Sequence, residues 1–276
     1  MTQSASKDKP LAPVAIAIAA HPDDIEYCMG GTLMMLGRAG YELHYLNLAA
    51  GNCGSVEFDS DTTAKKRRQE SRNAAKILGA TWHPPMCKDL EIFYDAKTLR
   101  KLASIIRKVR PSIVLTHSPQ DYMEDHMEMC RLVVTAAFAK GMPNFKVTPA
   151  RSATEQDITV YHAMPHGLRD PLRRRIVPGS YVNTTPVHES KIESLSAHKS
   201  QQNWLGVSQG MNSYLQTMDD YSREVGCMSG KFEHGEGWRR HLHLGFSGEE
   251  IDPLKDALKK DCKINKKYER SLEDIR

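Results

Sequence analysis

The 276-residue sequence lacks several features that would assign a protein to a class at once. No apolar run reaches 18 residues, so we expect no membrane-spanning helix and no membrane partner. The six cysteines form no CxxC pair, which argues against a zinc ribbon and indicates free thiols, so we expect a cytoplasmic protein. Neither GxGxxG nor GxxxxGK[ST] occurs, and a nucleotide-binding loop is therefore not indicated.

The sequence also has little excess charge of either sign. Against 34 Asp and Glu it has 38 Lys and Arg, and the net charge of +4 is too weak to indicate a nucleic-acid partner. A hydrophobic content of 40% is enough for one large domain with a full core. We expect a disordered tail over residues 1–12 and a single domain over 13–276. That domain divides into a core over 13–150 and a C-terminal part over 151–276.

Strand and helix patterns alternate through the first half of the chain. Strands are predicted at 14–20, 41–49, 81–83 and 112–116, and helices at 28–39, 62–78, 95–109 and 126–139. This alternation predicts an α/β three-layer sandwich with a mostly parallel central sheet. Beyond residue 150 we expect a smaller α+β extension. Its predicted elements are strands at 158–161 and 180–183, helices at 187–204 and 211–225, and a charged helix or a frayed end from Pro253.

One stretch combines a buried strand with ionisable side chains. The apolar run over residues 14–20 ends in His21-Pro22-Asp23-Asp24. A core strand has no structural need for so many titratable groups at its end. Pro22 fixes φ at the start of the turn and stiffens it. The stretch therefore predicts a functional site at the carboxyl end of the first strand.

A second group of ionisable residues follows the predicted strand at 112–116. It consists of His117, Asp121, Asp125 and His126. In a doubly wound sheet, ligands bind outside the carboxyl ends of the strands, where the strand order reverses. The first and fourth strands flank that point in the common order. We therefore expect the two groups of residues to face each other, although they lie far apart in the sequence.

His21, Asp24 and His126 would together form a two-histidine, one-carboxylate set. This set recurs in catalytic zinc sites that keep a fourth position open for water. Zinc lowers the pKa of bound water to about 7, so hydroxide forms at neutral pH. Asp23 is adjacent to Asp24 and cannot easily share the metal with it. It is better placed as the general base that takes a proton from the water.

The remaining charged residues have less specific patterns. Asp121 or Asp125 can orient a metal-binding imidazole through a hydrogen bond. The run over 65–68, Lys-Lys-Arg-Arg, is expected to be the solvated face of a helix, and the three arginines at 173–175 are expected to be solvated as well.

At the two clusters the sequence resembles a known family, the LmbE-like (PIG-L) zinc-dependent N-acetylglucosaminyl deacetylases. Residues 20–26, AHPDDIE, resemble its first signature, and residues 121–126, DYMEDH, resemble its second. Weaker similarities follow at 51–55, 67–79, 181–185, 197–201 and 235–239. Together they cover roughly residues 14–245.

The resemblance implies a Rossmann-like fold and a metal-dependent hydrolase. The implied reaction removes an acetyl group from an N-acetylated amino sugar of the N-acetylglucosamine type, or from a related small-molecule amide. The implied cofactor is Zn²⁺, held by His21, Asp24 and His126, with Asp23 as general base. This agrees with the interpretation of the two clusters, and Fe²⁺ remains an alternative metal because the ligand set tolerates both ions.

The same resemblance adds two site residues and a partner. It implies Arg67 as a substrate contact, contrary to the solvated face expected from the charge run alone. His198 matches a late histidine of the family and is a candidate for a second layer around the site. The C-terminal part is implied to complete the pocket, and homo-oligomers, trimers or hexamers, are common in the family.

One position departs from the family pattern. Many members have a histidine three residues before the last metal ligand, where it can help to polarise the substrate carbonyl. Here that position is Met123, whose side chain cannot donate a hydrogen bond. The oxyanion would then rely on zinc as a Lewis acid or on another donor, for which Tyr122, His166 and His198 are the candidates. The departure suggests a subgroup with an altered substrate.

Two other functions fit part of the pattern. Two histidines and one carboxylate also form the facial triad of non-haem Fe(II) oxygenases. Those enzymes usually have an all-β scaffold, and the strand–helix alternation argues against it. Methionine at position 123 also fits a non-catalytic sugar-binding relative, although the ligands and the base are all retained.

Overall fold

The computed structural model describes residues 12–209 and 213–273, and nearly all of the predicted tail over 1–12 lies outside this range. The strands are β1 Val14–Ala19, β2 Glu42–Asn47, β3 Thr81–His83, β4 Ile113–Thr116, β5 Thr159–Ala163, β6 Ser180–Asn183, β7 Gly235–Arg240 and β8 Cys262–Ile264. The helices are α1 Asp24–Cys28, α2 Gly30–Arg38, α3 Ser60–Ile77, α4 Ala96–Val109, α5 Glu124–Phe138, α6 His188–Ser196, α7 Lys199–Gln209, α8 Tyr214–Ser229, α9 Pro253–Leu258 and α10 Lys266–Glu273.

All eight strands join one sheet in the order β3-β2-β1-β4-β5-β7-β6-β8. The first five strands of this order are parallel, and β7, β6 and β8 pair antiparallel. The predicted α/β fold with a mostly parallel sheet is therefore confirmed. The C-terminal elements do not build a separate sheet; they extend the parallel one.

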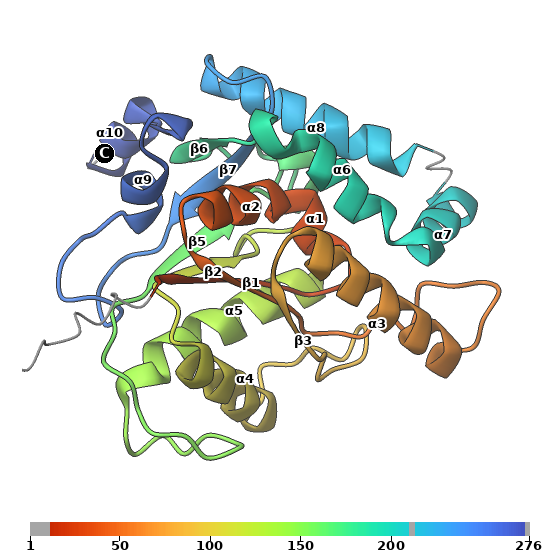
Figure 1. Ribbon diagram of the computed structural model, residues 1–276, viewed down its shortest axis with the longest axis horizontal. Helices are drawn as coiled ribbons and strands as arrows, with labels where there is room; N and C mark the ends of the chain where they lie inside the picture. The colour runs from red at the N-terminus through yellow and green to blue at the C-terminus, as the bar shows by residue number, and fades with distance from the viewer. Residues whose placement is uncertain (1–11, 210–212, 274–276) are drawn as a thin grey trace, which may run out of the picture.

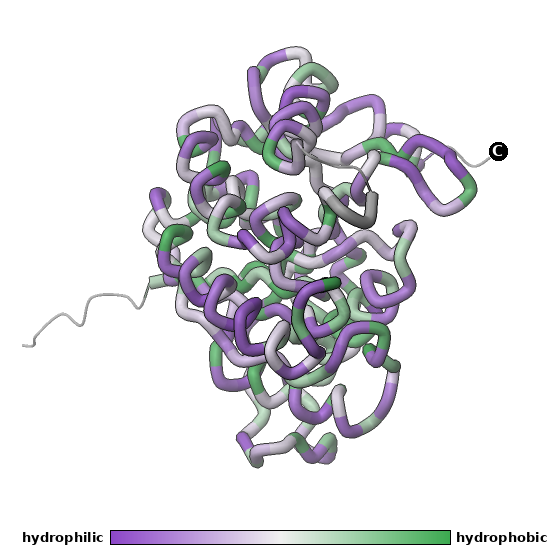
Figure 2. Tube along the Cα trace, turned by 90° about the vertical axis from the view of Figure 1, so that its right-hand side faces the viewer, coloured by the Kyte–Doolittle hydropathy of each residue, from purple (hydrophilic) through white to green (hydrophobic). Residues whose placement is uncertain are grey.

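Helices cover both faces of the sheet, as a buried parallel sheet requires. On one face, Ile16 and Ile18 of β1 pack against the apolar sides of α4 and α5. On the other face, the small side chains at alternate positions 15, 17 and 19 leave room for α1 and α2. Figure 1 shows these helices as layers below and above the strands. In Figure 2 the hydrophobic segments gather in the middle of the molecule and the hydrophilic ones lie on its outer helices and loops.

The strand order brings the two predicted clusters together. β1 lies between β2 and β4 and is parallel to both, with Ile18 opposite Thr116. From β1 the chain adds β2 and then β3 on one side of the sheet, and β4 and β5 follow on the other side. The strand order therefore reverses between β1 and β4. The loops after residues 19 and 116 begin next to each other there.

Several predicted elements differ from those observed. The helix predicted over 28–39 is two helices, because α1 begins directly after the His-Pro-Asp turn and the chain breaks at Met29 before α2. The helix predicted over 187–204 also divides, between α6 and α7. The start of the helix predicted over 211–225 falls partly outside the described residues. Two strands, β7 and β8, were not predicted, because Gly-Glu-Gly-Trp-Arg-Arg and Cys-Lys-Ile lack a clear alternation of apolar and polar residues.

In the part of the chain that the structure describes, no helix combines the length and the apolar character needed to cross a membrane.

Candidate active site

The turn after β1 carries three of the predicted site residues, His21, Asp23 and Asp24, and all three line one cavity. The amide N–H of Asp24 donates to the carbonyl oxygen of His21 at 3.3 Å, which closes the turn around Pro22. Asp23 adopts φ 108°, a left-handed backbone conformation that costs free energy for any residue other than glycine. The backbone amide of His21 donates to Asp24 Oδ2 at 2.7 Å and so restrains that carboxylate. Such strain is typical of a position whose side-chain direction is functionally constrained.

His21, Asp24 and His126 converge from the turn after β1, from α1 and from α5. Asp24 lies between the two rings, with its Oδ2 3.5 Å from His21 Nδ1 and its Oδ1 3.5 Å from His126 Nε2. One donor atom from each residue lies within 4.8 Å of the others, which suits a single metal ion. Imidazole and carboxylate donors in this combination fit Zn²⁺ or Fe²⁺.

A second triplet, His117, Asp121 and His126, also meets the distance condition for a metal. It fits an ion less well, because the lone pair of His117 Nε2 accepts the backbone N–H of Ala20 at 3.1 Å. Burial and the charge of His126 lower the pKa of His117, which keeps its ring neutral and suited to that accepting role. Asp121 is already engaged with the far nitrogen of His126. We therefore assign the site to the first triplet.

Each of the two candidate ligand histidines has a carboxylate behind it. Asp125 Oδ2 lies 2.9 Å from His21 Nε2, and Asp121 Oδ1 lies 3.0 Å from His126 Nδ1. Such contacts fix the tautomer and the ring orientation of metal ligands. Burial works to lower the pKa of His21, but the hydrogen bonds to Asp125 and Asp24 outweigh it and raise that pKa to about 10. A metal that bound here would therefore displace a proton from this ring.

Asp23 lies beside the metal set but has partners of its own. The hydroxyl of Tyr214, the first residue of α8, donates to Asp23 Oδ2 at 2.8 Å. Arg67 Nη2 lies 3.8 Å from Asp23 Oδ1. Burial raises the pKa of Asp23 to about 6, and the charge of Arg67 opposes the rise. A carboxyl group with a pKa near neutrality can both accept and return a proton.

Arg67 points into the site, whereas its neighbours in the charge run point away. It is 2% exposed, and Lys65, Lys66 and Arg68 are exposed. Its Nη2 donates to the carbonyl oxygen of Pro22 at 2.6 Å, so it also holds the turn. The solvated-face prediction from the charge run alone is therefore wrong for this residue. The α-helical spacing of α3 turns one residue of the four inward.

The glycine loop after β2 lies against Arg67. Gly51 has φ +76°, and a Cβ atom there would lie 2.6 Å from the Cδ of Arg67. Asp89 accepts the backbone N–H groups of Gly51 at 2.7 Å and Cys53 at 2.9 Å. No sequence pattern singles out Asp89, because it follows no predicted strand and belongs to no motif.

Met123 lines the site at the position where many family members have a histidine. Two of the three candidate replacements, Tyr122 and His166, line the same cavity. The Tyr122 ring lies edge-on to His126, with 5.5 Å between ring centroids, and 6.0 Å from His166. Burial lowers the pKa of His166, so its ring is neutral and can donate one hydrogen bond.

His198 has a different position from the other candidates. It is fully buried, with its Nε2 3.2 Å from Glu26 Oε1, and it does not line the cavity. Burial acts to lower the pKa of His198, but the charge of Glu26 outweighs it and raises that pKa. The charge of His198 in turn works to lower the pKa of Asp23. His198 therefore lies outside the cavity wall, whereas Tyr122 and His166 form part of it.

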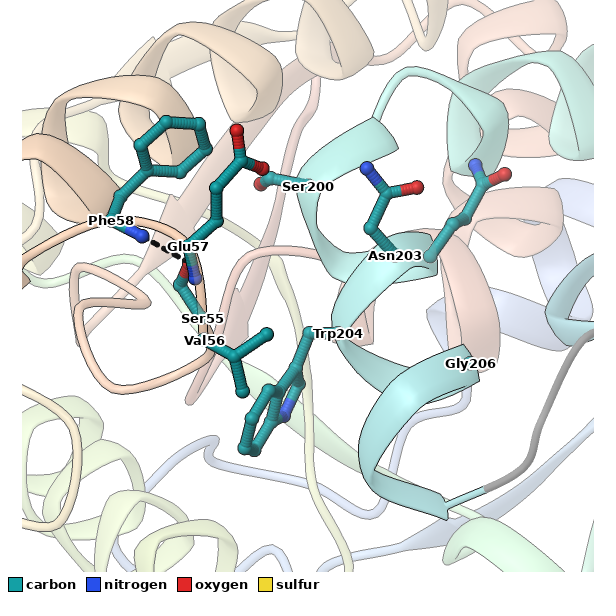
Figure 3. Close-up of a pocket in the computed structure, with 9 residues that line it drawn as sticks. Ser55, Val56, Glu57, Phe58, Ser200, Asn203, Trp204 and Gly206 are labelled. Atoms are coloured by element: carbon teal, nitrogen blue, oxygen red, sulfur yellow. Dashed lines mark hydrogen bonds between the residues drawn. The ribbon is translucent and has the colours of Figure 1, made fainter.

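The cavity in front of these groups has a volume of about 310 Å³. Its other walls include Tyr27, Leu90, Trp204 and Tyr214, none of which belongs to a predicted motif. Trp204 of α7 also lines a neighbouring hollow of about 630 Å³, together with Val56 and Phe58 of the loop before α3. Figure 3 shows the Trp204 ring and Val56 pointing toward each other across this hollow. Trp204 is thus a wall shared by the two hollows.

Comparison with known proteins supports the resemblance seen in the motifs. Residues 16–138 match the PIG-L family, described as GlcNAc-PI de-N-acetylase. Diacetylchitobiose deacetylase of Thermococcus kodakarensis is 28% identical over 196 residues, which cover 67% of this chain and 69% of that protein. The 4-oxalmesaconate hydratase of Pseudomonas putida is 28% identical over 200 residues, which cover 68% of this chain and 74% of that protein.

A solved structure of similar fold is the N,N'-diacetylchitobiose deacetylase of Pyrococcus horikoshii. It superposes with a TM-score of 0.71 at 22% identity and covers 88% of this chain and 89% of that one. The predicted resemblance to the PIG-L family is therefore confirmed.

Proposed function

On the premise that residues 16–138 are related to the PIG-L de-N-acetylases, we propose that the protein is a metal-dependent N-deacetylase. Its substrate would be an N-acetylated amino sugar of the N-acetylglucosamine type or a related small-molecule amide. The observation that carries the proposal is the division between two adjacent carboxylates. Asp24 lies between two histidine rings, while Asp23 is held apart from them by Tyr214.

His21, Asp24 and His126 would hold the ion, with Asp125 and Asp121 fixing the two rings. Zn²⁺ is the proposed metal, and Fe²⁺ is the alternative that the donor set also accepts. Such an ion supplies Lewis acidity toward an amide carbonyl and acidifies water. The site is rich in carboxylates, which favours a cation there.

Asp23 is the proposed proton carrier. It takes a proton from the water molecule that attacks the acetamide carbon. It then gives the proton to the nitrogen as the C–N bond breaks, and acetate and a free amine leave. A pKa of about 6 leaves the group ionised at neutral pH, as the first step requires.

Tyr122 and His166 are proposed to take over the role that a histidine at position 123 has in many relatives. Both line the cavity, and each can donate a hydrogen bond to a carbonyl oxygen. Loss of a donor of this kind typically lowers the rate by about 10²–10³. The hollow beyond Trp204 would then accommodate the remainder of the substrate.

The decisive experiment measures acetate release after reconstitution with Zn²⁺. The substrates are N-acetylglucosamine and diacetylchitobiose, and the proteins are wild type, Asp23→Asn and Asp24→Asn. We expect Asp23→Asn to retain the metal and to lose about 10²–10⁴ in rate. Equal rates in Asp23→Asn and wild type would exclude the proposed base.

The same preparation tests the other functions. Because one relative is a hydratase, hydration of 4-oxalmesaconate is assayed in parallel, and hydration without acetate release would favour that class. Consumption of O₂ with Fe²⁺ and no acetate release would favour an oxygenase. Sugar binding without turnover would favour a non-catalytic binding protein.

We further propose a single domain over 13–276, a cytoplasmic location and a homo-oligomer, a trimer or hexamer. All six cysteines are free thiols, which suits a reducing compartment. Light scattering on the purified protein tests the assembly, and limited proteolysis tests the domain.

A further inference from the structure

A second group of two histidines and one carboxylate lies outside the cavity described above. His188 is the first residue of α6, Asp219 lies in α8, and His234 directly precedes β7. Asp219 Oδ1 lies 2.6 Å from His188 Nε2 and 3.2 Å from His234 Nε2. One donor atom from each of the three lies within 4.8 Å of the others. None of the three lines the active-site cavity.

The two imidazole rings of this group have unsatisfied nitrogens. His188 is 7% exposed and His234 is 4% exposed. Among the described residues, His188 Nδ1 and both ring nitrogens of His234 have no hydrogen-bond partner. The rings stack with centroids 3.6 Å apart and planes 16° from parallel. Burying a ring nitrogen without a hydrogen-bond partner costs free energy. Because Asp219 makes no hydrogen bond to His234, a lone pair of the His234 ring is available to a metal ion.

The two oxygens of Asp219 have different partners, and only Oδ1 faces the two histidine rings. Its other oxygen, Oδ2, accepts hydrogen bonds from Arg223 Nε at 2.9 Å and from Gln216 at 3.3 Å. These contacts orient the carboxylate in the way that outer partners orient metal ligands. The Asp219 side chain is 17% exposed, so water can reach the group and complete a coordination shell.

We propose that His188, Asp219 and His234 bind a second divalent transition-metal ion, of the zinc class. Two imidazoles and one carboxylate suit Zn²⁺, whereas Mg²⁺ and Ca²⁺ prefer sites made of oxygen donors. The site is structural, since it is separate from the cavity. It ties together α6, α8 and the segment before β7, which are also joined by the Lys191–Glu236 and Arg223–Glu233 ion pairs.

The position of the second ion connects it to the active site through one helix. α8 carries Asp219 in its second turn and Tyr214 at its start, and Tyr214 donates to Asp23. Tethering α8 restrains the residue that holds the proposed base. Asp219 is thus a positioning residue, and the inference does not depend on which reaction the active site performs.

The test counts metal ions per chain by elemental analysis after chelation, reloading with Zn²⁺ and gel filtration. The proteins are wild type, Asp24→Asn, His234→Asn and the double variant. We expect two ions in wild type, one in each single variant and none in the double variant. One ion in wild type and none in Asp24→Asn would overturn the second site and leave the first intact. Two ions in His234→Asn would also overturn it.

A matched control and a variant-free measurement complete the test. His243→Asn removes a histidine outside both sites and should leave two ions. Zn²⁺ should raise the Tm of Asp24→Asn, because an ion that binds only the folded protein stabilises it. The rise in Tm should be lost when His234→Asn is added. If His234→Asn does not fold, anomalous diffraction from Zn²⁺-loaded wild-type crystals decides. A peak between the three side chains supports the site, and its absence overturns it.

Discussion

Tyr214 provides the sharpest test of how the proposed base is controlled. Its hydroxyl lies 2.8 Å from Asp23 Oδ2 in a buried setting, and Tyr214→Phe removes only that oxygen. A hydrogen bond to a charged group contributes about 1.5–3 kcal/mol. If the bond aims the carboxylate at the attacking water and so stabilises the transition state more than the free enzyme, its loss lowers kcat/KM by up to roughly 10- to 150-fold.

The pH profile should change in a defined direction as well. The hydrogen bond favours the ionised form of Asp23, whose pKa burial raises to about 6. Without the Tyr214 donor that pKa rises further. The acidic limb of kcat/KM against pH therefore moves to higher pH in Tyr214→Phe, and activity near pH 6 falls more than activity near pH 8.

The assay is acetate release from an N-acetylated amino sugar at equal zinc content, over a pH series. Tyr221→Phe is the matched control, because Tyr221 is buried on the same helix but donates to the carbonyl oxygen of Met164. It should leave the acidic limb in place. Adding Tyr214→Phe to Asp23→Asn should cost little more than Asp23→Asn alone. Full activity in Tyr214→Phe, or additive losses in the double variant, would refute the reasoning.

Three further perturbations test other parts of the structure. Lys191 and Glu236 form a fully buried ion pair at 2.7 Å, so Lys191→Met should lower the free energy of unfolding in urea by about 3–5 kcal/mol. Burial lowers the pKa of His162 to about 4, so the unfolded chain binds more protons between pH 6.5 and 4. Unfolding free energy should fall by up to about 3 kcal/mol from this group over that range, and less steeply in His162→Asn. Gly51→Ala should reduce kcat/KM, because the new Cβ displaces Arg67.

Each of these perturbations has a control. Lys191→Met combined with Glu236→Gln removes both charges, and recovery of part of the lost stability is expected; no recovery would argue that the cost is one of packing. Gly79→Ala has the same kind of strained backbone as Gly51→Ala, with φ +72°, but open space around the new Cβ. It should lower stability and leave kcat/KM unchanged. Identical pH dependence of unfolding in wild type and His162→Asn would show that His162 does not titrate as inferred.

The sequence by itself determined the α/β architecture and where the candidate site lies on it. The apolar run of β1 followed by His21-Pro22-Asp23-Asp24, and the cluster after β4, lie at strand ends of a parallel sheet. Their adjacency follows from the common strand order of doubly wound sheets, in which the first and fourth strands are neighbours at the point where the order reverses. The sequence determined less about β7, whose pairing between β5 and β6 buries a segment with no apolar alternation of its own.

Only the tertiary structure decided which side chains support the two clusters. Tyr214 reaches Asp23 across 191 positions of the chain, and no local pattern predicts such a contact. The inward direction of Arg67 depends on the helical phase of α3 against the sheet, which the charge run conceals. His188, Asp219 and His234 come together only because α6, α8 and β7 pack against one another. Local periodicity and strand order can be inferred from residue types, whereas contacts between distant elements require the packed structure.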